Sequence, residues 1–385
     1  MTDLLYTDIE DALRDSVRST LKRRLNHEDV AKLYDEPLDA DSSTGGALWK
    51  ELASEVGVAG LMIPEDLGGA GTGARETAVV LEELGRAVAP VPFLTSSVIA
   101  TTALLEVGAD DLLRSLADGS SIAVLVLPWS RRRGAWEAVA GSVRPVAGAL
   151  GADIFLAPVS TEEGLTLVAH RADEVQVKPV TSFDMSRPLA EVVLPATGGE
   201  VLASGARARD AVDAALGAGA ALLASEQLGL MQECLENTVE YAKMRVQFAR
   251  PISSFQALKH RFADMYTELV HAHAAARNAA ASLAENDPEQ ELAAAVAQAY
   301  CSDAAVHVAE EALQLHGGIG MTWEHSSHVL LKRAKSDQLA LGTAQRHRTD
   351  LAELVDLQLV AEASGQQRPA GIAVTDMTQK ETTHV

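Results

Sequence analysis

Residues 241–256, YAKMRVQFARPISSFQ, decide the interpretation of this sequence. They interrupt a long region, beginning near Ala206, in which alanine and leucine recur at helical spacing. Because proline and glycine end helices, we expect breaks in this region at Pro251, at residues 285–288 and at Gly317-Gly318. The connections are short enough for successive helices to reverse direction, which predicts an antiparallel four-helix bundle.

The region before the bundle changes once, from apolar residues at helical spacing to short apolar runs. Its first third carries apolar residues at helical spacing, and the proline- and glycine-rich residues 62–71 predict a loop between two of the helices. The helices are expected at residues 9–25, 49–56, 75–88 and 95–107. Short apolar runs separated by turn residues then predict strands at residues 123–127, 154–158, 165–169 and 191–194.

These patterns predict a mainly α-helical protein with a small β-domain, a barrel or sandwich, in the middle. The expected units are an N-terminal helical domain over residues 1–120, the β-domain over 121–203, the four-helix bundle over 204–360 and a polar, mobile tail over 361–385. A chain of 385 residues is long enough for two or three such units.

Composition and charge exclude several classes of protein. Aromatic residues make up only 4% of the chain and the formal net charge is −22, so binding to nucleic acid or to an anionic membrane is not expected. The only triplet of consecutive arginines is the basic triplet at residues 131–133, next to Trp129 and Trp136. We interpret it as a solvated loop rather than as an anion site.

Cysteine usage and the N-terminus indicate the compartment. Cys234 and Cys301 lack the spacing of a zinc site or of a disulfide framework, so no metal is expected. The acidic N-terminus does not have the order of a signal peptide, and the sequence contains no evident apolar run of membrane-spanning length. A soluble protein of the cytoplasm is the prediction.

Three runs, in the same order along the chain, resemble motifs of the acyl-CoA dehydrogenases. Residues 241–256 are similar to the family's signature, QLHGGIGMTWE at residues 314–324 is similar to its glycine motif, and GTAQ at residues 342–345 is similar to a third motif. The loop at residues 62–71 also fits the N-terminal helical domain of that family. The resemblance covers roughly residues 8–357, and it is poorest in the β-domain.

The resemblance implies that the chain contacts FAD. Arg245 offers a forked, permanently charged donor for the pyrophosphate, with Gln247 as a polar donor and Phe248 packing near the adenosine. Gln314, with Gly317 and Gly318, resembles the group that reaches the FAD of a neighbouring subunit. Thr343 and Gln345 resemble the pair that touches FAD from the subunit holding its flavin ring.

Two half-sites in one chain imply an oligomer. The candidate cofactor-binding residues are therefore Arg245, Gln247, Phe248, Gln314, Gly317, Gly318, Thr343 and Gln345.

The catalytic base of the family is missing from this sequence. Dehydrogenation of an acyl thioester needs a glutamate that removes the α-proton while a hydride leaves the β-carbon. Its common position precedes the Gly-Thr pair and is Leu341 here, whereas the position used by a second branch is Gly219, next to Ala220 where an arginine is expected. The motifs that cradle the flavin ring have no counterpart between residues 127 and 157. No residue of this chain is therefore assigned a catalytic role.

This combination resembles the subunit without a base in the actinobacterial heterotetrameric acyl-CoA dehydrogenases of steroid side-chain degradation. The resemblance implies an α2β2 oligomer with a related subunit that supplies the base, an acyl-CoA substrate of the steroid side-chain class, and electron-transfer flavoprotein as the acceptor. Three alternatives stay open at this point. The first is a homomeric dehydrogenase in which Asp337 or Glu226 replaces the base, the second a flavin-free structural subunit, and the third a flavin monooxygenase on the same fold.

Overall fold

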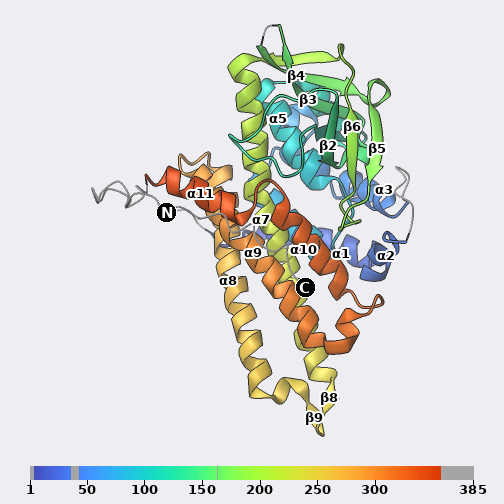
Figure 1. Ribbon diagram of the computed structural model, residues 1–385, viewed down its shortest axis with the longest axis vertical. Helices are drawn as coiled ribbons and strands as arrows, with labels where there is room; N and C mark the ends of the chain where they lie inside the picture. The colour runs from blue at the N-terminus through green and yellow to red at the C-terminus, as the bar shows by residue number, and fades with distance from the viewer. Residues whose placement is uncertain (1–3, 36–42, 163, 357–385) are drawn as a thin grey trace, which may run out of the picture.

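The computed structural model describes residues 4–35, 43–162 and 164–356, so the expected tail over residues 361–385 lies outside the described part. Helices precede and follow a central group of strands, and α7 (Gly205–Met244) runs from the strands to the β8–β9 hairpin at the far end of the molecule (Figure 1). The mainly helical architecture with a small β-domain in the middle is confirmed.

The N-terminal part is helical, as expected, but two of its helices contain π-helical turns. Residues 49–56 and 95–107, which were expected to be plain α-helices, contain the π-helical segments η1 and η4. Its elements are α1 (Asp8–Arg24), α2 (His27–Lys32), α3 (Ser43–Lys50), η1 (Glu51–Glu55), η2 (Val58–Gly60), η3 (Glu65–Leu67), α4 (Ala74–Ala87), η4 (Phe93–Ala100), α5 (Thr101–Val107) and α6 (Asp110–Ala117).

The strands form two small sheets that enclose a separate apolar core. One sheet has the order β1-β3-β4-β7 and the other β2-β6-β5. Val124, Phe155 and Val192 are buried between them. The elements are β1 (Ala123–Leu125), β2 (Ser142–Ala147), η5 (Ala149–Gly151), β3 (Ile154–Thr161), β4 (Gly164–Arg171), η6 (Ala172–Glu174), β5 (Gln176–Val180), β6 (Leu189–Val193) and β7 (Glu200–Ser204).

The C-terminal part contains three long helices and a fourth that is divided in two. Leu341 (φ 53°) and Gly342 (φ 102°) lie in the left-handed region and separate α10 from α11, so the expected fourth long helix is not continuous. The elements after α7 are β8 (Val246–Gln247), β9 (Arg250–Pro251), η7 (Ile252–Ser254), α8 (Gln256–Ala284), α9 (Gln290–His316), η8 (Gly317–Met321), α10 (Ser327–Leu339) and α11 (Ala344–Leu354).

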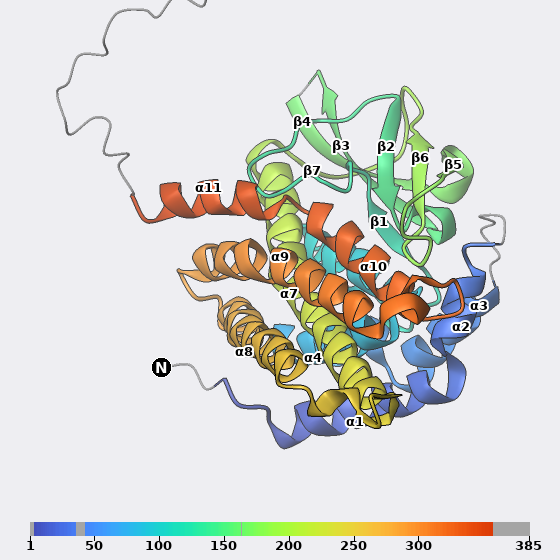
Figure 2. The same cartoon turned by 60° about the horizontal axis from the view of Figure 1, so that its bottom comes forward.

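Two glycines allow α4 and α7 to cross at backbone contact. A β-carbon added at Gly229 of α7 would lie 1.9 Å from the carbonyl oxygen of Glu82, and one added at Gly85 of α4 would lie 2.1 Å from that of Glu226. Any side chain at either position would therefore push the helices apart. This crossing joins the N-terminal helices to the long axis of the bundle (Figure 2).

Helix α7 is also the one described helix that is long and apolar enough to cross a membrane. The expectation that no apolar run reaches membrane-spanning length is therefore wrong for α7, in which alanine and glycine dilute the apolar run. In the folded chain 89% of its most apolar stretch is buried inside the protein. This degree of burial is typical of a core helix of a bundle.

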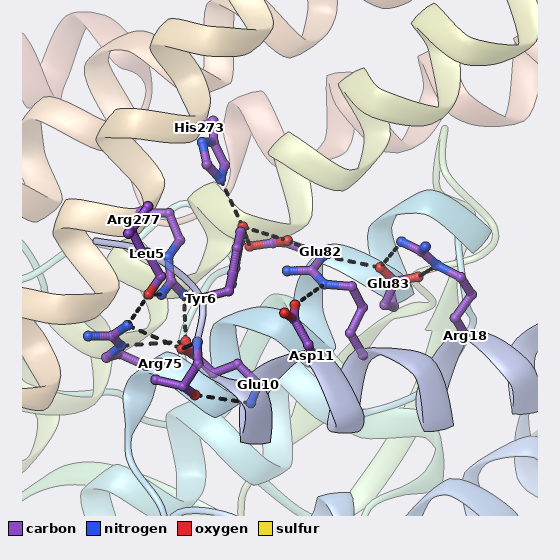
Figure 3. Close-up of polar contacts among 12 residues, drawn as sticks. Leu5, Tyr6, Glu10, Asp11, Arg18, Arg75, Glu82, Glu83, His273 and Arg277 are labelled. Atoms are coloured by element: carbon purple, nitrogen blue, oxygen red, sulfur yellow. Dashed lines mark hydrogen bonds and ion pairs between the residues drawn. The ribbon is translucent and has the colours of Figure 1, made fainter. Parts of the chain in front are cut away.

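The segment that precedes α1 is fastened to α4 and α8 by polar contacts (Figure 3). The Tyr6 hydroxyl donates to the Glu82 carboxylate at 2.8 Å and lies 2.9 Å from His273 Nε2. The guanidinium groups of Arg14 and Arg277 lie 4.3 and 4.1 Å from the centre of the Tyr6 ring. Two cations over a half-buried aromatic ring stabilise this arrangement.

Glu10 is the second anchor of the same segment. Its carboxylate accepts from Arg277 at 2.8 Å and from Arg75 at 3.1 Å, and it also accepts the Thr7 amide in a capping box at the start of α1. Burial raises the pKa of the Glu10 carboxyl, but these hydrogen bonds outweigh burial and lower the pKa to about 2.

Candidate functional site

Three predicted cofactor residues lie at the free end of α7. Arg245 caps α7 through its backbone amide, which donates to the Tyr241 carbonyl at 2.8 Å, and its side chain is exposed. Gln247 and Phe248 follow in the β8–β9 hairpin, where Phe248 has φ 50° and its side chain is 88% exposed. The Phe248 ring meets the Phe255 ring edge-on, with their centres 6.1 Å apart, and the rest of its surface is open to contact with another molecule.

Gln314, Gly317 and Gly318 lie at the same end of the molecule, where α9 passes into η8. All three are exposed, and a β-carbon added at either glycine would meet nothing within 4 Å. The glycines therefore do not serve a close contact within the described chain. The ring of Tyr241 lies 4.6 Å from that of His316, which brings this end of α9 next to the end of α7.

Thr343 and Gln345 are separate from those six residues. They lie at the start of α11. Helix α10, with 13 residues and a length of about 20 Å, separates them from η8. The Thr343 hydroxyl accepts from the Arg346 amide at 3.4 Å and so caps α11, while Gln345 is exposed. The structure thus brings residues 245–248 and 314–318 together and places residues 343–345 elsewhere.

The two positions in which the resemblance expects a base converge on one apolar point. A β-carbon added at Gly219 would lie 3.1 Å from Leu341 Cδ1 and 2.8 Å from a side-chain carbon of Ile99. Leu341 and Gly219 are both buried. A sequence comparison treats these positions as unrelated, although in the fold they face each other and neither presents a group that could accept a proton.

The basic triplet covers the start of the Gly342–Thr343 turn. The Leu341 amide donates to the Trp129 carbonyl at 2.9 Å, and a β-carbon added at Gly342 would lie 2.8 Å from Arg132 Cδ. Arg132 forms a two-pronged ion pair with Asp350 of α11, at 2.8 and 2.7 Å, and its side chain is only 20% exposed. The interpretation of this triplet as a solvated loop is wrong for Arg132.

Further contacts fasten the segment of residues 128–136 to the bundle. Arg133 pairs with Glu291 of α9. The Gly134 amide and the Trp136 indole both donate to Asp213 of α7, at 2.8 and 2.7 Å. The pairing of Arg132 with Asp350 spans 218 residues, so no local pattern in the sequence indicated it.

A cavity of about 680 Å³ lies beside this segment, between α5, α7, α9 and α11. Alanine and glycine form most of its wall on α7 and α9, and charged residues surround it toward α11 and the basic triplet. Residues that define it are Leu105, Arg132, Gly217, Ala221, Ala294 and Asp350. Its volume is typical of sites for small organic ligands.

Asp337 and Glu226, the candidates for a relocated base, belong to a buried ionic cluster. Arg333 donates to Glu226 at 2.6 Å and to Asp184 at 2.7 Å, and Arg187 pairs with both Glu226 and Asp337. Burial, and then the Glu226 charge, raise the pKa of Asp337 well above its usual range. Neither carboxylate is among the described residues that line the cavity.

Family models match the chain on both sides of its strands. The acyl-CoA dehydrogenase N-terminal domain matches residues 7–117, and the acyl-CoA dehydrogenase C-terminal domain matches residues 209–355. The chain belongs to the acyl-CoA dehydrogenase family. Members of this family are FAD-dependent oxidoreductases, so the expected family and its cofactor are confirmed.

Among acyl-CoA dehydrogenases, the chain is similar to proteins from actinobacteria. "Acyl-CoA dehydrogenase IpdE2" of Mycolicibacterium smegmatis is 37% identical over 86% of this chain and 93% of its own length. A chain in the crystal structure of the ChsE4-ChsE5 complex from Mycobacterium tuberculosis has a TM-score of 0.80 and 26% identity, covering 93% of this chain and 100% of that chain. A chain of the Tcur3481-Tcur3483 steroid ACAD has a TM-score of 0.78 and 26% identity, covering 93% and 99%.

Proposed function

We propose that this chain is the subunit without a catalytic base in an acyl-CoA dehydrogenase made of two different chains. Its residues Arg245 and Gln314 would bind the FAD of the related partner subunit. The observation that carries the proposal is the apolar contact of Leu341, Gly219 and Ile99 at the place where the family has its glutamate. A carboxylate is needed there to remove the α-proton, and no residue at this point can do so.

The basic triplet supports the same conclusion for the flavin ring. The resemblance places the ring beside the Gly342–Thr343 turn, where FAD would accept the hydride from the β-carbon. In this chain the side chain of Arg132 lies against Gly342 and is held there by Asp350. The residues present therefore do not fit a flavin ring at this turn, and no chemical step is assigned to it.

The half-site formed by residues 245–248 and 314–318 has the properties that binding a partner's cofactor requires. Arg245 is exposed at the end of α7 and has no ion-pair partner among residues 4–35, 43–162 and 164–356. A guanidinium without a carboxylate partner is free to bind the pyrophosphate of a nucleotide cofactor. Phe248, Gly317 and Gly318 are exposed beside it, as a surface shared between subunits would be in a single chain.

The substrate and the partners are proposed by likeness to relatives. One related structure is described as a steroid ACAD and another as a complex of two different chains. We therefore propose a steroid side-chain CoA thioester as the substrate, an α2β2 oligomer as the assembly and electron-transfer flavoprotein as the acceptor. A relocated base is not favoured, because Asp337 and Glu226 are enclosed by arginines.

Purification of the chain alone and with candidate partner chains tests the proposal. Flavin absorbance and the mass of each assembly are measured on the same samples. We expect little flavin on the isolated chain and about one FAD per pair of unlike chains in the mixed oligomer. One FAD per chain in a homogeneous, active preparation would overturn the proposal.

A further inference from the structure

The amino end of α10 is capped by an imidazole instead of by its own cap residue. Ser326 occupies the N-cap position, but its side chain makes no capping hydrogen bond. The amide of Ser327, the first residue of α10, donates to His325 Nδ1 at 3.2 Å, and the Ser327 hydroxyl lies 2.8 Å from the same nitrogen. His325 thus accepts from the residue two positions later, as an asparagine does in an Asx turn.

This geometry defines the tautomer of His325. A backbone amide can only donate, so Nδ1 of His325 carries a lone pair and the ring hydrogen is on Nε2. The His316 ring lies 4.3 Å from it, and His316 Nδ1 donates to the Ala312 carbonyl at 2.7 Å. The two rings lie on either side of η8 and join the end of α9 to the start of α10.

We propose that His325 is a positioning residue, whose neutral ring holds the connection between α9 and α10 so that Gln314 and Gly318 face the partner's cofactor, and whose protonation releases that connection. The inference rests on the proposed function for what Gln314 and Gly318 contact. The capping contact itself does not depend on that function.

Protonation would remove the cap for two physical reasons. A proton on Nδ1 takes the lone pair that accepts the Ser327 amide, and it places a positive charge at the end of α10 that already carries the positive pole of the helix dipole. If both rings took a proton, two like charges would lie 4.3 Å apart, which disfavours protonation of the pair.

The surroundings of the pair favour the neutral rings. Burial, followed by the nearby His316, His328 and His27, lowers the pKa of His325, and burial lowers the pKa of His316. Other titratable or charged groups around the pair come from α7, from α2, from the connection itself and from α10. They are Tyr241, Glu28, Lys32, Asp35, Glu324 and Lys332.

The direction of the pH dependence follows from those shifts. A histidine whose pKa is lowered by folding contributes stability that is fully present above its usual pKa of 6.5. This contribution is lost as the pH falls through the folded-state pKa. The connection, and with it the presentation of Gln314 and Gly318, should therefore loosen in mildly acidic solution.

Hydrogen exchange of the full chain, alone and in the mixed oligomer, measures the connection directly. We compare the amides of residues 317–327 at about pH 7.5 and pH 5.5, corrected for intrinsic exchange. In the wild type we expect protection to fall by about five- to tenfold at the lower pH, which corresponds to one hydrogen bond and a charge at a helix end. FAD retention by the mixed oligomer should fall in parallel.

Three variants separate positioning from general stability. His325→Asn keeps an acceptor that does not titrate, so protection should stay high at both pH values. His325→Ala removes the acceptor, so protection of these amides should be low at both pH values. His307→Asn, on the exposed side of α9 beside Glu268, is the matched control and should behave as the wild type does.

Equal pH dependence in His325→Asn and in the wild type would overturn the proposal, as would unchanged protection in His325→Ala. These outcomes are distinct from a failure of the proposed function. If protection changes as expected while FAD retention follows neither pH nor Arg245, the cap is real and the shared cofactor site is wrong.

Discussion

Arg245 and Arg250 lie on the same hairpin but in different surroundings. The guanidinium of Arg250 lies 3.9 Å from the centre of the Phe255 ring, whereas that of Arg245 has no ion-pair partner within the described ranges. The two side chains carry the same charge, are both exposed and lie five residues apart in the sequence. They therefore allow a specific cofactor contact to be separated from the general electrostatics of this end of the molecule.

Arg245→Ala in the mixed oligomer should weaken FAD retention by roughly ten- to a hundredfold, since one charge-assisted hydrogen bond contributes about 1.5–3 kcal/mol. Arg250→Ala is the control, and FAD retention should stay near that of the wild type. Flavin spectra and sedimentation are recorded together. Equal retention in both variants would refute the assignment, and dissociation of the oligomer would make Arg245 an interface residue.

Arg333 shows how a buried charge differs from an exposed one. Its guanidinium is held by Asp184 and Glu226, and the three side chains are almost fully buried. Arg333→Met should lower the free energy of unfolding by about 3–5 kcal/mol, because Asp184 loses its arginine partner and Glu226 keeps only Arg187. Arg348→Met, whose ion pair with Asp303 is half exposed, should cost less than about 1 kcal/mol. Urea denaturation measures both, and similar losses would contradict this account of the cluster.

At the level of elements, the segment before α1 is held to α4 and α8 by charged hydrogen bonds rather than by a large apolar face. Tyr6 lies between two guanidinium groups, and Glu10 accepts from Arg75 and Arg277 (Figure 3). Such contacts depend on ionisation, so the attachment of residues 4–10 should respond to acid.

Glu10→Gln tests this dependence. The wild-type carboxyl has a pKa of about 2 against a usual 4.5, so its stabilisation is fully present above pH 4.5 and is lost as the pH falls toward 2. The variant should lose about 1.5–3 kcal/mol at neutral pH and show a flatter acid limb. Thermal unfolding across this pH range measures both effects, with exposed Glu240→Gln as the control. An unchanged acid limb in Glu10→Gln would contradict this role.

At the level of the whole molecule, the chain keeps the family's architecture while its active-site positions are filled by its own side chains. Leu341, Gly219 and Ile99 meet where a base is needed, and Arg132 lies against Gly342. Phe248 and Gly318 are exposed at the other end of α10, and we propose that this end contacts the partner chain.

The isolated chain should not oxidise acyl-CoA thioesters, and Leu341→Glu should restore little activity. The new carboxylate would be buried beside Gly219 without a partner, and the residues around Gly342 do not fit a flavin ring. Leu339→Glu, two residues away on an exposed position, is the control for the added charge. A dye-linked dehydrogenase assay measures the activity. Strong activity in Leu341→Glu would show that the segment of residues 128–136 has been misinterpreted.

The sequence by itself determined the family, the helical and β regions and the candidates Arg245, Gln314 and Thr343, because motifs and periodicity are local properties of a chain. It missed β2, β5 and β7, whose mixed exposed and buried positions give no clear alternation. It also missed the break between α10 and α11, although Gly342 is a signal for a helix end, because the left-handed conformation of Leu341 is not indicated by its residue type.

Only the tertiary structure decided that Leu341 faces Gly219, that Arg132 pairs with Asp350 and that His325 caps α10 next to His316. The first two relations join residues more than a hundred positions apart, and helix packing sets such distances. The capping contact is local, but its meaning depends on a neighbouring helix end. For these reasons the sequence could name the candidate site residues, whereas only the fold could show which other side chains occupy the site.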